Sequence, residues 1–321
     1  MMLSGERIAV IGAGVAGCMV ARNLADKGAR LEVFDKSRGT GGRLAASRLG
    51  DVSADLGADV FDESTAMRLM RVESLPLQLW SHTRADLQLQ SRTRADAWVS
   101  APRASALTRQ LLDGIPLHGQ TRITELKPAE QDCWWLQDES GRYWGPYNRV
   151  IIAVPAPQAV PLLAGAPDLQ SAAAAVRMSS AWVLLLALSQ RPRVLQAVDL
   201  LEGEHSVLSR VCRDSGKPGR SGEVWQLRAR ADWSDRHVDA NPEYVAQQLL
   251  DAFVDLVEEP VQVARHRIHR WLYADVATSS GSPPLCGTGR LGVCGDWVCG
   301  QGLSAAMQSA DLLTRALEAD Q

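Results

Sequence analysis

The chain has 321 residues, of which 46% are hydrophobic and 22% charged, and its formal net charge at pH 7 is −3. This composition is typical of a globular protein with a large core, and the lack of basic surplus argues against a nucleic-acid partner. The start, residues 1–7, is too short and polar for a secretory signal, and no apolar run reaches the roughly 20 residues that span a bilayer. We therefore expect a cytoplasmic protein without a membrane partner.

The cysteines are scattered along the chain. None of them forms a C-x-x-C pair, and no clustered histidines accompany them. Such scatter is typical of reduced, mostly buried thiols, so we expect neither disulfides nor a metal site. The six positions are Cys18, Cys133, Cys212, Cys286, Cys294 and Cys299.

The chain begins with a strand–helix–strand pattern. Residues 7–11 (RIAVI) form a short apolar run that stops at a glycine, which is typical of a buried parallel strand. Residues 15–27 carry apolar residues at helical spacing and end at Gly28, a favourable helix C-terminus. Residues 31–34 (LEVF) form a second short strand. This βαβ beginning predicts an α/β fold with a parallel sheet.

Antiparallel strands are predicted next. The string Thr-Arg-Ala-Asp occurs at 83–86 and again at 93–96. This repeat is too short for a solenoid, and it indicates two adjacent antiparallel strands. Residues 134–137 and 142–144 form another such pair around the turn sequence Glu-Ser-Gly.

Later parts of the chain again predict short apolar strands and helices like those at its beginning. Residues 150–154 (VIIAV) form a continuous apolar strand, an apolar run follows at 182–188, and residues 242–257 have the periodicity of an amphipathic helix. Near the end, a short strand at 291–294 is followed by a helix at 303–317. Parallel-sheet segments at the start, middle and end, with antiparallel material between them, predict one discontinuous domain with a second domain inserted.

A dinucleotide fingerprint lies between the first strand and helix. Residues 12–17 (GAGVAG) match G-x-G-x-x-G, in which Gly12 allows the tight turn, Gly14 lets the backbone approach a pyrophosphate, and Gly17 lets helix and strand pack closely. Asp35 ends the second strand, where a carboxylate accepts hydrogen bonds from ribose hydroxyls. The alternative is a glycine-rich turn without a ligand. A second match, at 287–292, precedes a strand, and we interpret it as a fortuitous loop.

Two further segments bear on which dinucleotide is bound. Residues 37–43 (SRGTGGR) follow the second strand, and Gly295-Asp296 precede the last helix. Here the chain resembles the amine-oxidase-like flavoproteins, whose R-x-G-G-R element and C-terminal Gly-Asp both hold FAD. The resemblance implies that Arg43 neutralises the pyrophosphate and that Asp296 bonds the ribityl chain. It also implies non-covalent FAD, since the cysteine that links the flavin of monoamine oxidases lies well upstream of the C-terminal motif.

The resemblance implies a full set of FAD contacts and a division of the chain. It predicts an α/β fold with a discontinuous Rossmann-like FAD-binding domain (1–62, 101–158 and 286–321) and an inserted mixed antiparallel-sheet α+β substrate domain (63–100 and 159–285). The residues expected at the cofactor are Gly12, Gly14, Ala16, Gly17, Asp35, Lys36, Gly42, Arg43, Ile123, Gly295, Asp296, Gly302 and Leu303.

Within these flavoproteins the chain is most similar to the renalase branch. The matching strings are FDKSRG at 34–39, WV at 98–99, VIIAVPAP at 150–157, HRWLYA at 269–274 and CGDW at 294–297. Renalase-like enzymes oxidise dihydronicotinamide isomers with FAD and pass the electrons to O2. The resemblance therefore implies an oxidase that takes hydride from a small donor and forms hydrogen peroxide.

The substrate side departs from that pattern. Where renalase-like proteins usually have D-x-G-A-Q-Y-F, this chain has Asp59 and Val60 at the Gln and Tyr positions, and residues 302–306 also differ. The pocket candidates are Asp59 and Phe61 from one segment and His269 and Trp271 from another. His269, Trp271 and Tyr273 share one face of a predicted strand, where they either stack on a flat substrate or pack between domains.

No side chain stands out as catalytic, because hydride leaving a dihydropyridine yields an aromatic pyridinium without a base. Two alternatives stay open. In the first, the protein is an amine oxidase in which Asp59 pairs with a cationic substrate. In the second, it is a flavin-binding redox or partner module without turnover.

Overall fold

The computed structural model describes residues 5–70, 72, 74–278, 285–287 and 290–319. The chain forms two compact units. The first unit comprises Met1–Gly42, Thr108–Met178 and Asp275–Gln321, and the second comprises Arg43–Leu107 and Ser179–Ala274.

The first unit is built on a parallel sheet whose strands come from distant parts of the chain. Its strand order is β17-β11-β1-β2-β7, and every neighbouring pair is parallel. The carboxyl ends of these strands therefore meet at one edge of the sheet, the edge at which open α/β sheets bind ligands. The strands are β1 (Arg7–Ile11), β2 (Arg30–Phe34), β7 (Leu117–His118), β11 (Arg149–Ile152) and β17 (Leu291–Val293).

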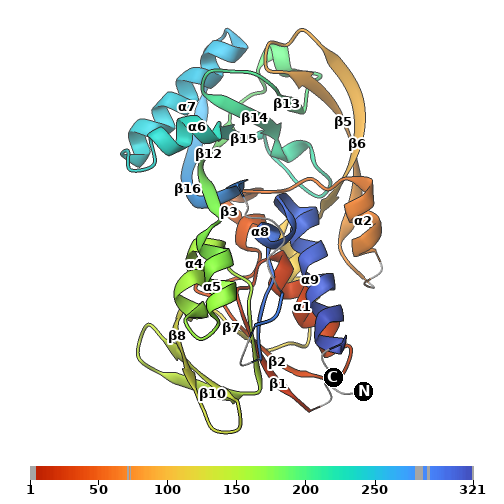
Figure 1. Ribbon diagram of the computed structural model, residues 1–321. Coiled ribbons are helices and arrows are strands. Elements are labelled where there is room, and N and C mark those ends of the chain that lie inside the picture. The colour runs from red at the N-terminus through yellow and green to blue at the C-terminus, as the bar shows by residue number, and fades with distance from the viewer. Residues whose placement is uncertain (1–4, 71, 73, 279–284, 288–289, 320–321) are drawn as a thin grey trace. The chain divides into compact units, whose positions relative to one another are not determined.

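Helices and a small antiparallel sheet complete the first unit. Helices α1 and α9 lie side by side (Figure 1), and Asn23 of α1 donates to Asp311 of α9 over 3.3 Å. The antiparallel sheet has the order β10-β9-β8. These elements are α1 (Val15–Ala25), β8 (Ile123–Pro128), β9 (Trp134–Asp138), β10 (Tyr143–Tyr147), α4 (Ala156–Ala159), α5 (Pro167–Ala174), α8 (Asp296–Cys299) and α9 (Gly302–Ala319).

The second unit is built on a seven-stranded mixed sheet, of order β16-β12-β15-β14-β13-β5-β6, in which only β13 and β5 pair in parallel among the described pairs. Its elements are β3 (Ala46–Leu49), β4 (Val52–Asp55), α2 (Glu63–Leu69), β5 (Leu77–Asp86), β6 (Arg92–Ser100), β13 (Leu200–Glu202), β14 (Leu208–Arg213), β15 (Val224–Ala229), α6 (Ala231–Arg236) and α7 (Pro242–Val257). Four elements cross a unit boundary: a short 3-10 helix (Gly42–Leu44), α3 (Ser105–Leu111), β12 (Arg177–Leu188) and β16 (Val263–Thr278).

Strand β12 is buried on both of its faces, which explains the continuous apolar run at 182–188. Trp182 and Leu184 of β12 pack into a core with residues of helix α7, which lies along the sheet in Figure 1. Their neighbours Val183 and Leu185 point to the opposite face and pack with Leu49 and other residues of the β3–β4 hairpin. A strand buried on both faces loses the polar–apolar alternation of a half-exposed strand.

The α/β fold class with an inserted mixed sheet is confirmed. The two Thr-Arg-Ala-Asp strings lie on the antiparallel strands β5 and β6, with Thr83 opposite Arg94, and the helix predicted at 242–257 is α7. The compact units divide the chain at other positions than the sequence-based domains. Residues 43–62 belong to the second unit and residues 159–178 to the first. The second glycine motif, at 287–292, lies partly outside the described residues, since residues 288 and 289 are not among them.

Candidate functional site

The glycine loop after β1 requires glycine at two positions. The Gly12 N–H donates to the Phe34 carbonyl over 2.7 Å, its φ is +110°, and a Cβ there would lie 2.6 Å from the Ala153 carbonyl oxygen. A Cβ at Gly17 would overlap the Gly12 carbonyl oxygen. Gly14 differs, because a Cβ there would meet no heavy atom within 4 Å. The loop is therefore tightly packed at Gly12 and Gly17 and open at Gly14, which leaves its backbone accessible to a ligand.

Asp35 ties this loop to the next one. Its Oδ2 accepts from the Ala13 N–H and its Oδ1 from the Ser37 N–H, each over 2.7 Å. A carboxylate offers about four lone-pair sites, so these two bonds leave capacity for ribose hydroxyls.

The loop at 37–42 lies directly against the glycine loop. The Gly41 N–H donates to the Ala13 carbonyl over 2.8 Å, and Gly14 and Gly41 form a parallel bridge. Gly42 has a φ of +52°, and a Cβ there would lie 3.2 Å from the Gly14 Cα. The two glycine-rich motifs, separate in sequence, thus form one surface at the carboxyl edge of the sheet.

The Gly-Asp motif follows β17 at the same edge. The Gly295 N–H donates to Ser309 Oγ over 2.8 Å, and the Asp296 carboxylate is buried and accepts from the Trp297 N–H over 3.0 Å. The Trp297 Nε1–H donates to the Val154 carbonyl over 3.1 Å, which connects the loops after β17 and β11. Gly302 then begins the long helix α9, and a Cβ at Gly302 would meet no heavy atom within 4 Å.

The other expected cofactor residues have different surroundings. Ala16 is buried in α1, and Leu303 is half-buried at the start of α9. Lys36 lies at the surface, where partial desolvation is the main cause and nearby Arg122 the second cause of its lowered pKa. Ile123 is the first residue of β8, and its side chain packs into the core, so only its main chain can face a ligand.

Arg43 is the first residue of the second unit, and both its backbone carbonyl and its guanidinium form hydrogen bonds. Its carbonyl accepts from the Ala58 N–H over 2.9 Å, and its guanidinium donates to the Ala274 carbonyl over 2.9 Å. A guanidinium has five N–H donors, so this bond is compatible with a phosphate partner.

Asp59 is buried and paired inside the second unit. Its Oδ1 lies 2.9 Å from Arg210, and its Oδ2 contacts Lys217. Burial alone would raise the pKa of Asp59, but Arg210 and Lys217 hold it well below its usual range. The carboxylate considered for a cationic substrate is therefore already neutralised by the chain itself.

Asp59 belongs to a group of six charged residues, four of them buried and two arginines partly buried, here called the buried ionic cluster, that sequence reasoning missed. Arg220 lies 2.6 Å from Asp55 and 2.7 Å from Asp214, and Lys217 lies 2.8 Å from Asp214. Burial raises the pKa of Asp55 to about 6 against the opposing effect of Lys217. The cluster consists of Asp55, Asp59, Asp214, Arg210, Lys217 and Arg220.

No sequence signal pointed to this cluster. Residues 214–220 (DSGKPGR) read as a polar turn, and they lie far along the chain from Asp55 and Asp59. Carboxylate oxygens of Asp55, Asp59 and Asp214 approach within 4.8 Å of one another, as in a metal site. The Lys217 ammonium contacts all three carboxylates, and so supplies a cation from within the chain.

The remaining candidates fall into two kinds. The Phe61 side chain is buried in the core, and its backbone pairs with Trp98. His269 and Trp271 share one face of β16, with ring centroids 4.3 Å apart at 72°, as the strand periodicity predicts. The Trp271 Nε1–H donates to the Leu56 carbonyl over 2.9 Å. Burial is the main cause of the lowered pKa of His269, and the positive charge of nearby Arg267 is the second cause. The Nε2 of His269 is buried without a hydrogen-bond partner among the described residues.

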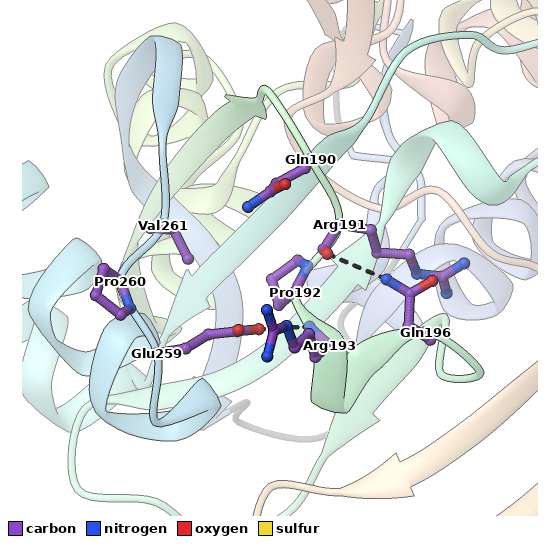
Figure 2. A pocket seen from close by; sticks show the side chains of 8 residues that line it. All are labelled: Gln190, Arg191, Pro192, Arg193, Gln196, Glu259, Pro260 and Val261. Atoms are coloured by element: carbon purple, nitrogen blue, oxygen red, sulfur yellow. Dashed lines mark hydrogen bonds between the residues drawn. The ribbon is translucent and has the colours of Figure 1, made fainter.

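A small pocket of about 250 Å³ lies elsewhere in the second unit, between the loop after β12 and the segment after α7 (Figure 2). Inside it, the Gln196 side chain donates to the Arg191 carbonyl over 3.1 Å, and the Arg193 N–H donates to Glu259. None of the residues predicted from sequence lines it. Its lining residues are Gln190, Arg191, Pro192, Arg193, Gln196, Glu259, Pro260 and Val261.

Comparison with known proteins supports a nucleotide-binding first segment. Residues 10–72 match the profile of the NAD(P)-binding Rossmann-like domain family. Over 75 residues the chain is 37% identical to a zeta-carotene-forming phytoene desaturase from Myxococcus xanthus. That match covers 22% of this chain and 14% of the desaturase, so it spans only a small part of that enzyme.

Solved structures share the fold over nearly the whole chain. A proposed protoporphyrinogen oxidase from Exiguobacterium sp. 255-15 matches with a TM-score of 0.77 and 13% identity, covering 99% of this chain and 100% of that one. A CLA-producing fatty acid isomerase from P. acnes matches with a TM-score of 0.74 and 12% identity, covering 97% of this chain and 98% of that one. Cyclohexylamine oxidase from Brevibacterium oxydans IH-35A matches with a TM-score of 0.73 and 13% identity, covering 98% of this chain and 99% of that one. At such identities the likeness shows a shared fold and does not define the reaction. Among the residues that the structure describes, no helix is long and apolar enough to cross a membrane.

Proposed function

We propose that the chain is a flavoprotein oxidoreductase whose first unit binds FAD without a covalent link. The pairing of Gly14 with Gly41 carries this proposal, because it joins the fingerprint loop and the loop at 37–42 into one surface with Asp35 at its base. The Gly-Asp loop after β17 lies at the same edge of the sheet. A single fingerprint serves many nucleotides, whereas these three elements together match the amine-oxidase-like flavoproteins.

The residues at this edge fit the proposed cofactor. The open backbone at Gly14 would receive the pyrophosphate at the N-terminus of α1, where N–H groups and the helix dipole favour a phosphate. Asp35 would accept from ribose hydroxyls, and Arg43 would add a charge-assisted bond to the pyrophosphate. Asp296 would bond the ribityl chain, and the N-terminus of α9 would stabilise negative charge on the reduced ring system.

We further propose that the substrate is a small hydride donor such as a dihydronicotinamide isomer, as in renalase-like enzymes. Bound FAD would supply the two-electron acceptor, which passes the electrons to O2 as hydrogen peroxide. No side-chain base is required, because the oxidised donor is an aromatic pyridinium. The protein would contribute orientation and exclusion of side reactions, and the aromatic pair His269 and Trp271 offers flat surfaces for such a donor.

The buried pairing of Asp59 disfavours the amine-oxidase alternative. Arg210 and Lys217 already neutralise the carboxylate that would have paired with an ammonium group. A flavin-binding module without turnover would share every cofactor contact, so activity alone separates it from an oxidase.

Anaerobic spectra of the purified protein with a panel of dihydronicotinamides and amines test the proposed reaction. We expect the visible absorbance of the flavin to bleach with dihydronicotinamide isomers and to return in air, with formation of peroxide. Bleaching by amines alone would assign the protein to amine oxidation. Absence of bleaching with every donor would contradict an oxidase and leave the binding module.

A further inference from the structure

Lys217 is the centre of the buried ionic cluster. Its side chain is fully buried, and its ammonium lies 2.8 Å from Asp214 and 3.6 Å from Asp55 and also contacts Asp59. Burial alone would lower the pKa of Lys217, but the carboxylates of Asp214 and Asp59 raise it, so the ammonium stays charged. Because burying an ammonium carries a large desolvation penalty, this arrangement is retained only if the partners compensate for it.

The cluster is balanced in charge. Three carboxylates (Asp55, Asp59 and Asp214) face three cations (Arg210, Lys217 and Arg220), and each carboxylate contacts at least two of the cations. Removal of any one member would leave the cluster with one uncompensated charge. Removal of one cation and one carboxylate together would restore the balance.

The cluster holds both ends of the segment from Asp55 to Asp59. Between those ends, the Gln226 side chain donates to the Asp55 carbonyl over 2.7 Å, and Trp271 donates to the Leu56 carbonyl. The Ala104 N–H donates to the Asp55 carboxylate over 2.9 Å. The segment is therefore fixed by its side chains and by its main chain.

This segment in turn fixes the backbone of Arg43. The Ala58 N–H donates to the Arg43 carbonyl over 2.9 Å, and the Leu56 N–H donates to the Ala45 carbonyl over 2.8 Å. Gly57 approaches so closely that a Cβ there would overlap the Arg43 carbonyl oxygen. A displacement of the segment would therefore displace Arg43.

We propose that Lys217 is a positioning residue for the cofactor: through Asp55 and Asp59 it fixes the segment on which the Arg43 backbone rests. The inference rests on the proposed function, in which the Arg43 guanidinium bonds the pyrophosphate. Lys217 itself touches neither the fingerprint loop nor the loop at 37–42 in the described contacts, so its effect on the cofactor is indirect.

A double-mutant cycle between Lys217→Met and Arg43→Ala tests this proposal. The dissociation constant for FAD is measured by diluting the holoprotein and following flavin fluorescence. We expect Lys217→Met to weaken FAD binding about tenfold in the wild-type chain and less than twofold in the Arg43→Ala chain, because the lysine acts through the arginine. The matched control, Lys127→Met, removes a surface lysine that bonds Tyr143 and should leave the dissociation constant unchanged.

The charge-balanced variant Asp59→Asn/Lys217→Met keeps the test decisive if Lys217→Met alone does not fold. It restores the charge balance and should fold, but it lacks the lysine contacts to Asp55 and Asp59, so it should bind FAD about tenfold more weakly than the wild type. Equal loss in both arms of the cycle, no loss in Lys217→Met, or wild-type FAD affinity in the balanced variant would each overturn the positioning role. A wild-type protein that binds no FAD would refute the proposed function instead, so the two failures are distinguishable.

Discussion

Substitution of Asp59 by asparagine isolates the contribution of one buried ion pair. Asp59 is 3% exposed and pairs with Arg210 and Lys217. Asp59→Asn therefore removes the negative charge that both cations share. Breaking a buried pair by removing one partner costs about 3–5 kcal/mol. Because asparagine retains one acceptor, we expect a loss of about 3 kcal/mol in the free energy of unfolding.

Urea unfolding, followed by tryptophan fluorescence and circular dichroism, measures this loss. The control Asp96→Asn changes an exposed carboxylate on β6 that bonds Ser81, and it should stay within about 0.5 kcal/mol of the wild type. The folded pKa of Asp59 is depressed, so its stabilising effect is present above the unfolded pKa near 3.9 and is lost as pH falls through the folded value. The Asp59 carboxylate stays ionised from pH 5 to 8, so the loss should be present throughout this range, and it should be largest near pH 5 because Asp59 also helps to raise the pKa of Asp55. A loss below about 1 kcal/mol would refute the reasoning.

Three further predictions concern the cofactor, the donor and the cluster. Arg43→Ala should weaken FAD binding roughly tenfold to a hundredfold, since a charge-assisted bond contributes about 1.5–3 kcal/mol; unchanged retention of FAD on gel filtration would contradict it. Trp271→Ala, measured with FAD in saturating excess because the indole also holds the Leu56 carbonyl, should slow anaerobic flavin reduction by the active donor, and a wild-type reduction rate would remove Trp271 from the donor surface. The raised pKa of Asp55, about 6, predicts that the wild-type advantage in unfolding free energy over Asp55→Asn grows as pH falls from 8 to 5. The increase should be about 1.4 kcal/mol in urea titrations, and a constant difference would contradict it.

The geometry of the fingerprint loop was predictable from sequence because its determinants are local. Gly12, Gly17 and Asp35 have roles set by a strand, a turn and a helix that follow one another in the chain. Gly295 lies at the same sheet edge because β17 pairs in parallel with β11, which the structure shows. The Gly14–Gly41 bridge, by contrast, depends on how the loop at 37–42 folds back, which no periodicity reveals.

The substrate side was less predictable because its contacts are long-range. Asp59 looked like an available carboxylate, and only the fold brings it beside Lys217 and Arg210, about 150 residues away in the chain. Phe61 was a pocket candidate, and its ring is 1% exposed because its backbone pairs with Trp98, a contact that the sequence does not reveal. That His269 and Trp271 share one face of the strand was predictable, because side chains alternate between the two faces of a strand.

The nucleotide released on acid denaturation of the purified protein tests the central claim most directly. We predict a yellow protein that releases one FAD per chain into the supernatant, identified by chromatography against FAD, FMN and NAD standards. Arg43→Ala serves as the matched variant and should release less FAD after the same gel filtration. A colourless protein that binds NAD with measurable heat, or one that releases FMN, would contradict the account.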